Sequence, residues 1–314
     1  METTTLKPNE IPEYFSNASF TLPNGQQYVS DDGKLIVSNN ELVMDSRMYR
    51  YKDIYAGVYN DLRFVYLSNN QLPAQGGLKY KIKMSNKQEY NCLTDEELCY
   101  LNIFNPCEDY NLCAGALVTL DNNANTADFF FTDNRLYVLY ERLAYLRTPQ
   151  NNYYAYTYLI PVKRLYRNEK VDVAVSYTPN VGLIWEVNGK QVFSVPYNQI
   201  GMGLSEQYRK YQAIDLGGTP QATIPESYSL GFGNFTLVDG LPYRWDKHTK
   251  AVAQLQLEHN YYYPGTQTPM RFVLKNDKRH GLVGQGNIST LYEMTISINF
   301  YNPSNNNITV TQSV

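Results

Sequence analysis

The sequence contains few of the residues from which most catalytic and metal centres are built. It has three histidines and four cysteines in 314 residues. The cysteines form no C-x-x-C pair, and no histidine lies near them: Cys92, Cys99, Cys107 and Cys113. These spacings disfavour a zinc site, so neither a metal nor another cofactor is expected. A cytoplasmic protein would keep the cysteines as thiols, whereas export would allow disulfides.

Long apolar runs, a secretory signal and a basic patch are also missing. The N-terminus, METTTLKPNEIPEYF, has neither a basic start nor an apolar segment. No stretch approaches the roughly 18 apolar residues of a membrane helix. The formal net charge is -3 and charged residues make up 18% of the chain, which disfavours binding to nucleic acid. We therefore expect a cytoplasmic protein that contacts neither membrane nor nucleic acid.

Familiar hydrolase motifs are absent as well. Retaining glycosidases of the sandwich type carry E-x-D-x-E, which brings two carboxylates to one strand face, and this spacing does not occur. There is no G-x-S-x-G motif, and three histidines are too few to identify a catalytic triad. The sequence therefore identifies no reaction directly.

Tyrosine is the residue that the chain has in excess, with 30 copies and 14% aromatic residues overall. Aromatic and β-branched residues favour a pleated, half-buried surface. The densest region runs from Asp128 to Val162 and reads DFFFTDNRLYVLYERLAYL, RTPQNN, YYAYTYLIPV. It predicts two strands joined by a polar loop that contains Pro149.

Strand alternation in this region defines the candidate site. In the first strand, Arg135, Tyr137 and Glu141 share one face, and Arg142 lies on the other. In an antiparallel pair, the tyrosines of the second strand would lie beside them and line a groove, because a packed phenol ring still needs a partner for its hydroxyl. The predicted catalytic residues are Glu141 as acid or base, with Arg142 and Tyr156. The predicted ligand-binding residues are Arg135, Tyr137, Tyr154, Tyr158 and Trp185.

Each of these assignments has a structural alternative. The tyrosines can pack on loops without forming a groove. Glu141 can pair with an arginine and only specify the sheet. Trp185, which precedes an Asn-Gly hairpin signal at residues 188–189, can be a core residue.

The remaining pattern predicts an all-β fold with few short helices. Leu78 to Met84 alternates apolar residues with lysines, which is typical of a half-exposed strand. Many short strands with regular turns indicate a β-sandwich of the jelly-roll type. Because no linker or repeat divides the chain, residues 1–314 are predicted to form a single domain. In this domain residues 1–12 would be a loose leader, and residues 241–314 would supply strands that complete the sandwich.

Several stretches between residues 109 and 240 carry a family resemblance. They are DYNLCAGALVTLDNNANTADFFFTDNRLYVLYERLAY, YAYTYLIPV, and LGFGNFTLVD. Together they resemble a bacterial and fungal family catalogued only as a domain of unknown function. The succession VDVAVSYTPNVGLIWEVNGKQVF also resembles the late strands of concanavalin-A-like jelly rolls. The resemblance implies a concanavalin-A-like β-sandwich and implies no activity.

Three functions remain open on this basis. The first is binding of a glycan or small molecule in a tyrosine-lined concave groove. The second is an enzyme that acts on a small metabolite or glycan, with Glu141 and its tyrosine and arginine partners as acid–base groups. The third is a structural or self-assembling protein, in which an exposed tyrosine surface forms a homo-oligomer interface.

Overall fold

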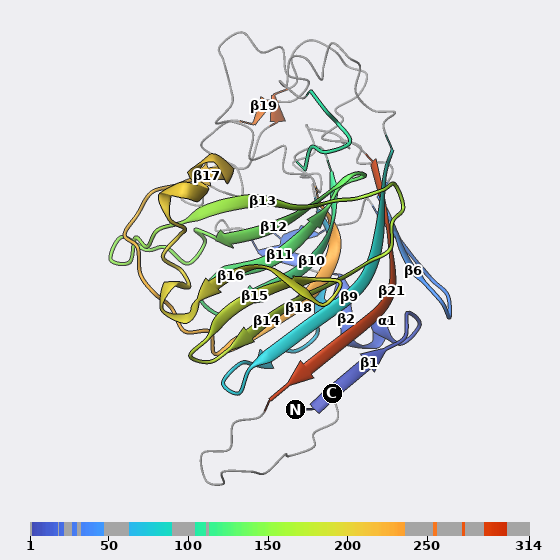
Figure 1. Ribbon diagram of the computed structural model, residues 1–314, viewed down its shortest axis with the longest axis horizontal. Coiled ribbons are helices and arrows are strands. Elements are labelled where there is room, and N and C mark those ends of the chain that lie inside the picture. The colour runs from blue at the N-terminus through green and yellow to red at the C-terminus, as the bar shows by residue number, and fades with distance from the viewer. Residues whose placement is uncertain are drawn as a thin grey trace.

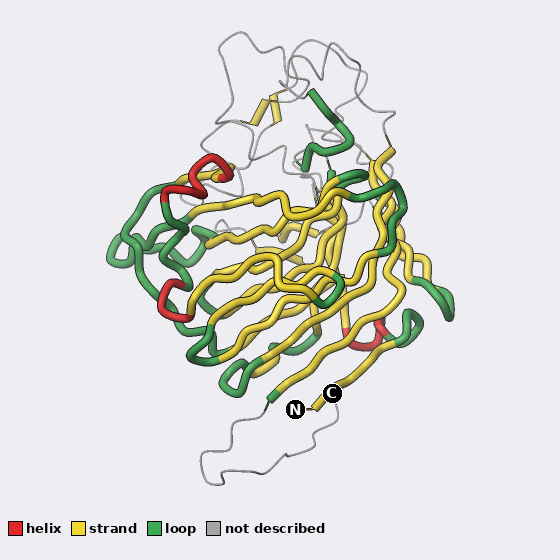
Figure 2. Tube along the Cα trace, viewed as in Figure 1, coloured by secondary structure: helices red, strands yellow, loops and turns green. Residues whose placement is uncertain are grey.

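The protein is a two-layer β-sandwich in the part of the chain that its computed structural model describes. The described residues are 2–17, 19–21, 27–29, 33–46, 63–89, 104–110, 113–235, 254–255, 272–273 and 286–299. Strands dominate them, and the helices are short (Figures 1 and 2): α1 (Ile11–Tyr14), η2 (Tyr197–Gln199) and η3 (Glu206–Tyr211). The predicted all-β class with few short helices is therefore confirmed.

Sheet A is antiparallel. Its strands are, in spatial order, β16 (Lys190–Pro196), β15 (Gly182–Val187), β14 (Val171–Thr178), β9 (Leu78–Glu89), β21 (Gly286–Ile298), β6 (Leu42–Asp45) and β5 (Lys34–Val37). A further strand, β1 (Glu2–Leu6), pairs with β21.

Sheet B is also antiparallel and has β8 (Leu72–Pro73) paired to β18. Its strands are, in spatial order, β17 (Gln212–Asp215), β13 (Tyr156–Arg164), β12 (Arg135–Arg142), β11 (Asn125–Phe131), β10 (Ala114–Asp121), β18 (Ser227–Phe235), β7 (Arg63–Ser68) and β2 (Phe15–Asn17). Two further pairs are β3 (Ser19–Thr21) with β4 (Gln27–Val29) and β19 (Gln254–Leu255) with β20 (Phe272–Val273).

The strand order identifies the sandwich as a jelly roll. Neighbouring strands are often distant in sequence: β9 lies between β14 and β21, and β10 lies between β11 and β18. Long connections of this kind carry the chain back and forth between two antiparallel layers. The predicted jelly-roll sandwich is therefore confirmed.

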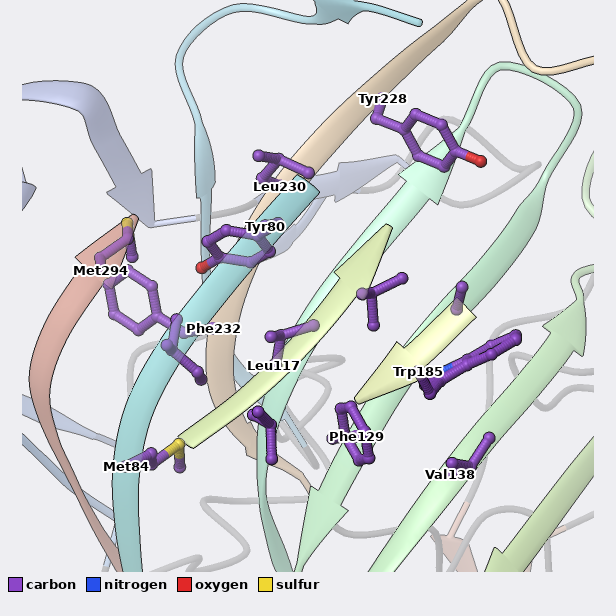
Figure 3. Close-up of a cluster of buried hydrophobic side chains, with 14 of the residues drawn as sticks. Tyr80, Met84, Leu117, Phe129, Val138, Trp185, Tyr228, Leu230, Phe232 and Met294 are labelled. Atoms are coloured by element: carbon purple, nitrogen blue, oxygen red, sulfur yellow. The ribbon is translucent and has the colours of Figure 1, made fainter. Parts of the chain in front are cut away.

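The core lies between the two sheets and contains the largest buried side chains (Figure 3). Phe129 and Val138 approach it from sheet B, and Trp185 approaches it from sheet A, each with an exposed fraction of 0%. The Trp185 Nε1–H donates to the backbone oxygen of Asp128 at 3.1 Å. This bond joins the two layers directly, because β15 and β11 belong to different sheets.

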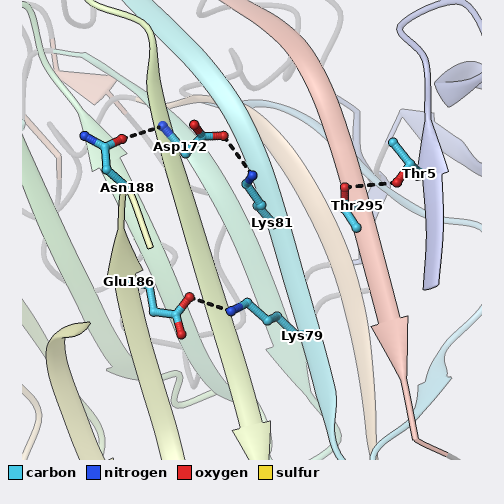
Figure 4. A network of polar contacts seen from close by, with 7 residues as sticks. All are labelled: Thr5, Lys79, Lys81, Asp172, Glu186, Asn188 and Thr295. Carbon is cyan, nitrogen blue, oxygen red and sulfur yellow. Dashed lines mark hydrogen bonds and ion pairs between the residues drawn. The ribbon is translucent and has the colours of Figure 1, made fainter. Parts of the chain in front are cut away.

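The predicted alternation of β9 is confirmed. Tyr80 and Ile82 are fully buried, whereas the lysines face outward and are half-buried. On this outer face of sheet A, Lys79 pairs with Glu186 at 2.5 Å and Lys81 with Asp172 at 3.0 Å (Figure 4). Because acidic neighbours neutralise both lysines, this face offers little attraction for an anion.

The N-terminus differs from the prediction of a loose leader. Residues Glu2–Leu6 form β1, which pairs antiparallel with β21 from Glu2↔Ile298 to Leu6↔Met294. The alternating Thr-rich sequence provides hydrogen-bonding side chains, and Thr3 Oγ1 lies 2.9 Å from Ser297 Oγ. The C-terminal region contributes β21 to sheet A, and most of the remaining residues from 241 to 314 lie outside the described ranges.

Two of the four cysteines lie within the described ranges, and both are free thiols. Cys107 is half-buried and Cys113 is buried, whereas Cys92 and Cys99 lie outside the described ranges. The described ranges hold no cluster of three or more His, Cys, Asp and Glu residues suited to a metal ion. They also hold no helix with the length and apolar character needed to cross a membrane.

Candidate functional site

β12 divides the predicted site residues between the two faces of sheet B. Its inner face turns toward sheet A and carries Tyr140 and Arg142. Its outer face carries Tyr137 and Glu141, next to a second apolar cluster that includes Leu139, Leu159 and Ile214. Successive residues of a strand point in opposite directions, so the side chains of Glu141 and Arg142 leave β12 toward opposite faces of the sheet.

The predicted tyrosine groove is wrong for Tyr156 and Tyr158, because both lie on the inner face of β13. Their exposed fractions are 1% and 3%, and their ring centroids lie 5.4 Å apart. Burial and the nearby hydroxyl of Tyr140 raise the pKa of Tyr156 well above its ordinary value. Tyr154 is half-buried beside them and accepts a hydrogen bond from Gln212 Nε2 at 2.7 Å. These phenols therefore pack in the core and stay protonated, which makes Tyr156 a poor general base.

Arg142 and Trp185 also make contacts that stabilise the fold. The Arg142 Nη1 donates to the backbone oxygens of Gly201 at 3.1 Å and Gln221 at 2.9 Å. Its guanidinium lies over the ring of Tyr153, 4.0 Å from the centroid. Arg142 therefore binds two loops at the end of β12. Trp185 belongs to the core described above.

Arg135 and Tyr137 lie together at the other end of the outer face. Arg135 Nη2 pairs with Glu108 Oε2 at 2.8 Å, and the Tyr137 hydroxyl donates to the Glu108 backbone oxygen at 2.7 Å. The Tyr110 ring packs edge-on against Tyr137 at 5.2 Å. Because Glu108 already neutralises the guanidinium, Arg135 is poorly suited to hold an anionic ligand.

Glu141 lies in a group of polar residues on the outer face, which we call the acid cluster: Glu141, Asp128, Thr126 and Thr157. The Thr157 hydroxyl donates to Glu141 Oε1 at 2.5 Å from the adjacent strand β13. On the other side, Thr126 of β11 is the direct cross-strand partner of Glu141. The Thr126 hydroxyl is buried and is without a hydrogen-bond partner in the described part of the chain.

Asp128 is the member of the acid cluster that the sequence prediction missed. It follows Thr126 by two residues, so alternation places it on the same face, diagonal to Glu141. Its Oδ1 accepts from the Thr119 backbone N–H at 2.6 Å. Burial raises the pKa of Asp128 well above 3.8, and the negative charge of Glu141 raises it further. The carboxyls of Glu141 and Asp128 are both buried and their charges interact, so the ionisation of Glu141 opposes that of Asp128.

A small cavity adjoins the acid cluster. It has a volume of about 10 Å³, and its lining includes Glu141 and Thr157 of the acid cluster together with Arg142 and Tyr156, but neither Asp128 nor Thr126. A cavity of this size holds about one water molecule. The cavity therefore combines the Glu141 carboxyl and the Thr157 hydroxyl with room for one water or one hydroxyl group.

Comparison with known proteins identifies a relative and several similar folds. An uncharacterised protein of Acanthamoeba polyphaga mimivirus is 24% identical over 254 residues, which are 63% of this chain and 54% of the relative. The chain thus spans about half the length of this curated relative. Because this relative is viral, the bacterial and fungal origin implied by the resemblance stays a prediction.

Among solved structures, β-agarase A from Zobellia galactanivorans has a TM-score of 0.45 at 10% identity, covering 94% of this chain and 92% of the agarase. The transglycosylase Crh5 in complex with NAG has a TM-score of 0.43 at 9% identity, covering 96% and 86%. Alginate lyase A1-II′ has a TM-score of 0.42 at 10% identity, covering 94% and 99%.

A family model matches most of the chain. The model of the family of unknown function DUF6081 matches residues 13–299, which is most of the chain and extends well beyond residues 109–240. The chain therefore belongs to the family of unknown function DUF6081.

Proposed function

We propose that the protein binds a hydroxyl-rich small molecule, such as a sugar unit of a glycan, through the acid cluster on the outer face of sheet B. The observation that carries the proposal is the placement of Glu141 and Asp128 on one face of sheet B, beside the Thr126 hydroxyl. Carboxylates accept hydrogen bonds from hydroxyl groups, and such charge-assisted bonds are stronger than neutral ones. A buried hydroxyl without a partner costs about 1–3 kcal/mol, which a ligand hydroxyl could recover.

The surroundings of the acid cluster limit the size of the group that it can bind. Phe130 and Tyr137 lie on the same face, and both are buried in the apolar cluster beside it. The cavity beside Glu141 is of water size, so it accepts one hydroxyl of a ligand and not a whole ring. In this account Tyr158 of β13 supports the site from the inner side and does not touch the ligand.

An acid–base enzyme is the second candidate, and the interaction between the two carboxyls favours it. A carboxyl that retains its proton can act as an acid, and a neighbouring ionised carboxyl can act as a base. Asp128 would take the first role and Glu141 the second. Turnover of a bound saccharide would distinguish an enzyme from a binding protein.

A cytoplasmic location, a single domain and self-association stay predictions.

Glu141→Gln tests the proposal. We expect a panel of hexoses and β-linked oligosaccharides to include a ligand that stabilises the wild type in thermal-shift assays. Loss of the charged acceptor should weaken that ligand about 10- to 100-fold, as expected for a hydrogen bond worth roughly 1.5–3 kcal/mol. The melting temperature without ligand should change little, because glutamine keeps an acceptor for the Thr157 hydroxyl.

Glu186→Gln is the matched control, because Glu186 is a half-buried glutamate on the outer face of sheet A. This variant should bind the ligand as the wild type does. The proposal is contradicted if no saccharide stabilises the protein. It is also contradicted if Glu141→Gln lowers the melting temperature of the ligand-free protein by several degrees, because Glu141 would then be a structural residue.

A further inference from the structure

A larger cavity lies between the two sheets at the N-terminal edge of the sandwich. Its volume is about 240 Å³, and its walls come from β1 and β21 of sheet A and from α1, β2, β7 and β8. A cavity of about 150 Å³ can hold a benzene molecule. This cavity can therefore hold a ring with a short substituent, and it is separate from the acid cluster.

The floor of this cavity is apolar. Leu6, Phe15 and Leu72 line it, with exposed fractions of 5%, 2% and 7%. All three belong to the core cluster between the sheets, so the cavity continues the core outward. An apolar body of a ligand would bury its surface here and gain the usual hydrophobic stabilisation.

The rim is polar: besides Thr4 and Asn70, whose side chains can both donate and accept, it contains Glu13 and Asn69. Asn69 Nδ2 already donates to the Glu13 backbone oxygen at 3.0 Å, which leaves the amide oxygen of Asn69 to accept. Glu13 and Tyr14 also line the cavity. Among the described residues that line the cavity, Glu13 is the one that carries a charge. The rim thus suits a group that carries donors and positive charge.

We propose that this cavity binds a primary amine attached to an apolar body of about the size of a phenyl group. The ammonium donates to Glu13 and to the amide oxygen of Asn69, and it lies within reach of the Tyr14 ring for a cation–π contact. The ring occupies the floor against Leu6, Phe15 and Leu72. A carboxylate at the same position would be repelled by Glu13, so the cavity selects by charge.

Backbone amide NMR with three probes tests this proposal: phenethylamine, 3-phenylpropionate and methylamine. Phenethylamine should shift the signals of residues 13–15 and 68–72 and bind at least fivefold more tightly than either other probe. Glu13→Gln should weaken it about fivefold, the value expected for a partly exposed ion pair worth about 1 kcal/mol.

Glu10→Gln is the matched control on the same turn. Glu10 Oε2 accepts from the Lys7 backbone N–H at 2.8 Å, and glutamine preserves that acceptor, so binding should be unchanged. The proposal is overturned if the three probes bind equally, if the shifted signals lie elsewhere, or if Glu13→Gln binds phenethylamine as the wild type does. None of these results depends on a ligand at the acid cluster.

Discussion

Replacing Trp185 with alanine is expected to lower the free energy of unfolding by about 3–5 kcal/mol, the usual range for a buried tryptophan. The side chain is fully buried. Its ring packs against Phe193 at 5.3 Å and edge-on against Tyr140 at 6.0 Å. Alanine would leave a large cavity and remove the Nε1–H bond to Asp128 that joins the sheets. Urea unfolding followed by far-UV circular dichroism would measure the difference.

Tyr166→Ala is the control for this experiment. Tyr166 is also aromatic but has an exposed fraction of 82%, so its loss should change the free energy of unfolding by less than about 0.5 kcal/mol. If Trp185→Ala is as stable as the wild type, Trp185 is not a core residue and its predicted role in ligand stacking would have to be reconsidered.

Replacing Arg142 with methionine is expected to lower the free energy of unfolding by about 3 kcal/mol. The exchange leaves the buried carbonyl of Gly201 without its donor, at about 1–3 kcal/mol, and also removes the part-buried bond to the carbonyl of Gln221. It also removes the cation–π contact with Tyr153, although the methionine chain keeps part of the packing. Hydrogen exchange should show faster exchange in the loops at residues 200–203 and 219–223.

The matched control is Arg209→Met. Arg209 pairs with Glu206 at 3.2 Å, but its side chain is 74% exposed, so the change in stability should stay within about 0.5 kcal/mol. An Arg142→Met variant that keeps full stability but loses activity would instead support the catalytic role predicted from the sequence.

The regular strands could be predicted because their signals are local. The Asn188-Gly189 dipeptide joins β15 to β16, and both residues have positive φ values of 50° and 75°. This is the geometry that a two-residue hairpin with the type I′ turn requires. The alternation of β9 similarly identified its buried face, because one of its faces is apolar and the other carries lysines.

The candidate site could be predicted only in part, because β12 is apolar on both faces. Leu136 and Val138 point inward, and Tyr137 and Leu139 point outward, and all four are buried. Alternation therefore separated Glu141 from Arg142 but did not show which side faces sheet A. Finding Asp128 required the pairing of β11 with β12, in which Asp128 lies opposite Leu139. That register depends on tertiary packing as well as on local sequence.

The N-terminal strand could not be predicted for a related reason. β1 reads ETTTL and has little apolar character of its own. It becomes a strand because it pairs with an edge of β21 that is nearly 300 residues away in sequence. A pairing over such a separation leaves no periodicity in a short polar segment.

The central claim, that Asp128 and Glu141 form one interacting pair on the outer face of sheet B, can be tested by a ¹³C-carboxyl NMR titration of Asp128. The pKa in the wild type should lie well above 3.8, because burial and the charge of Glu141 both raise it. In Glu141→Gln it should fall but stay elevated, because burial is the larger cause. A pKa near 3.8 that does not respond to this substitution would contradict the pair and the site built on it.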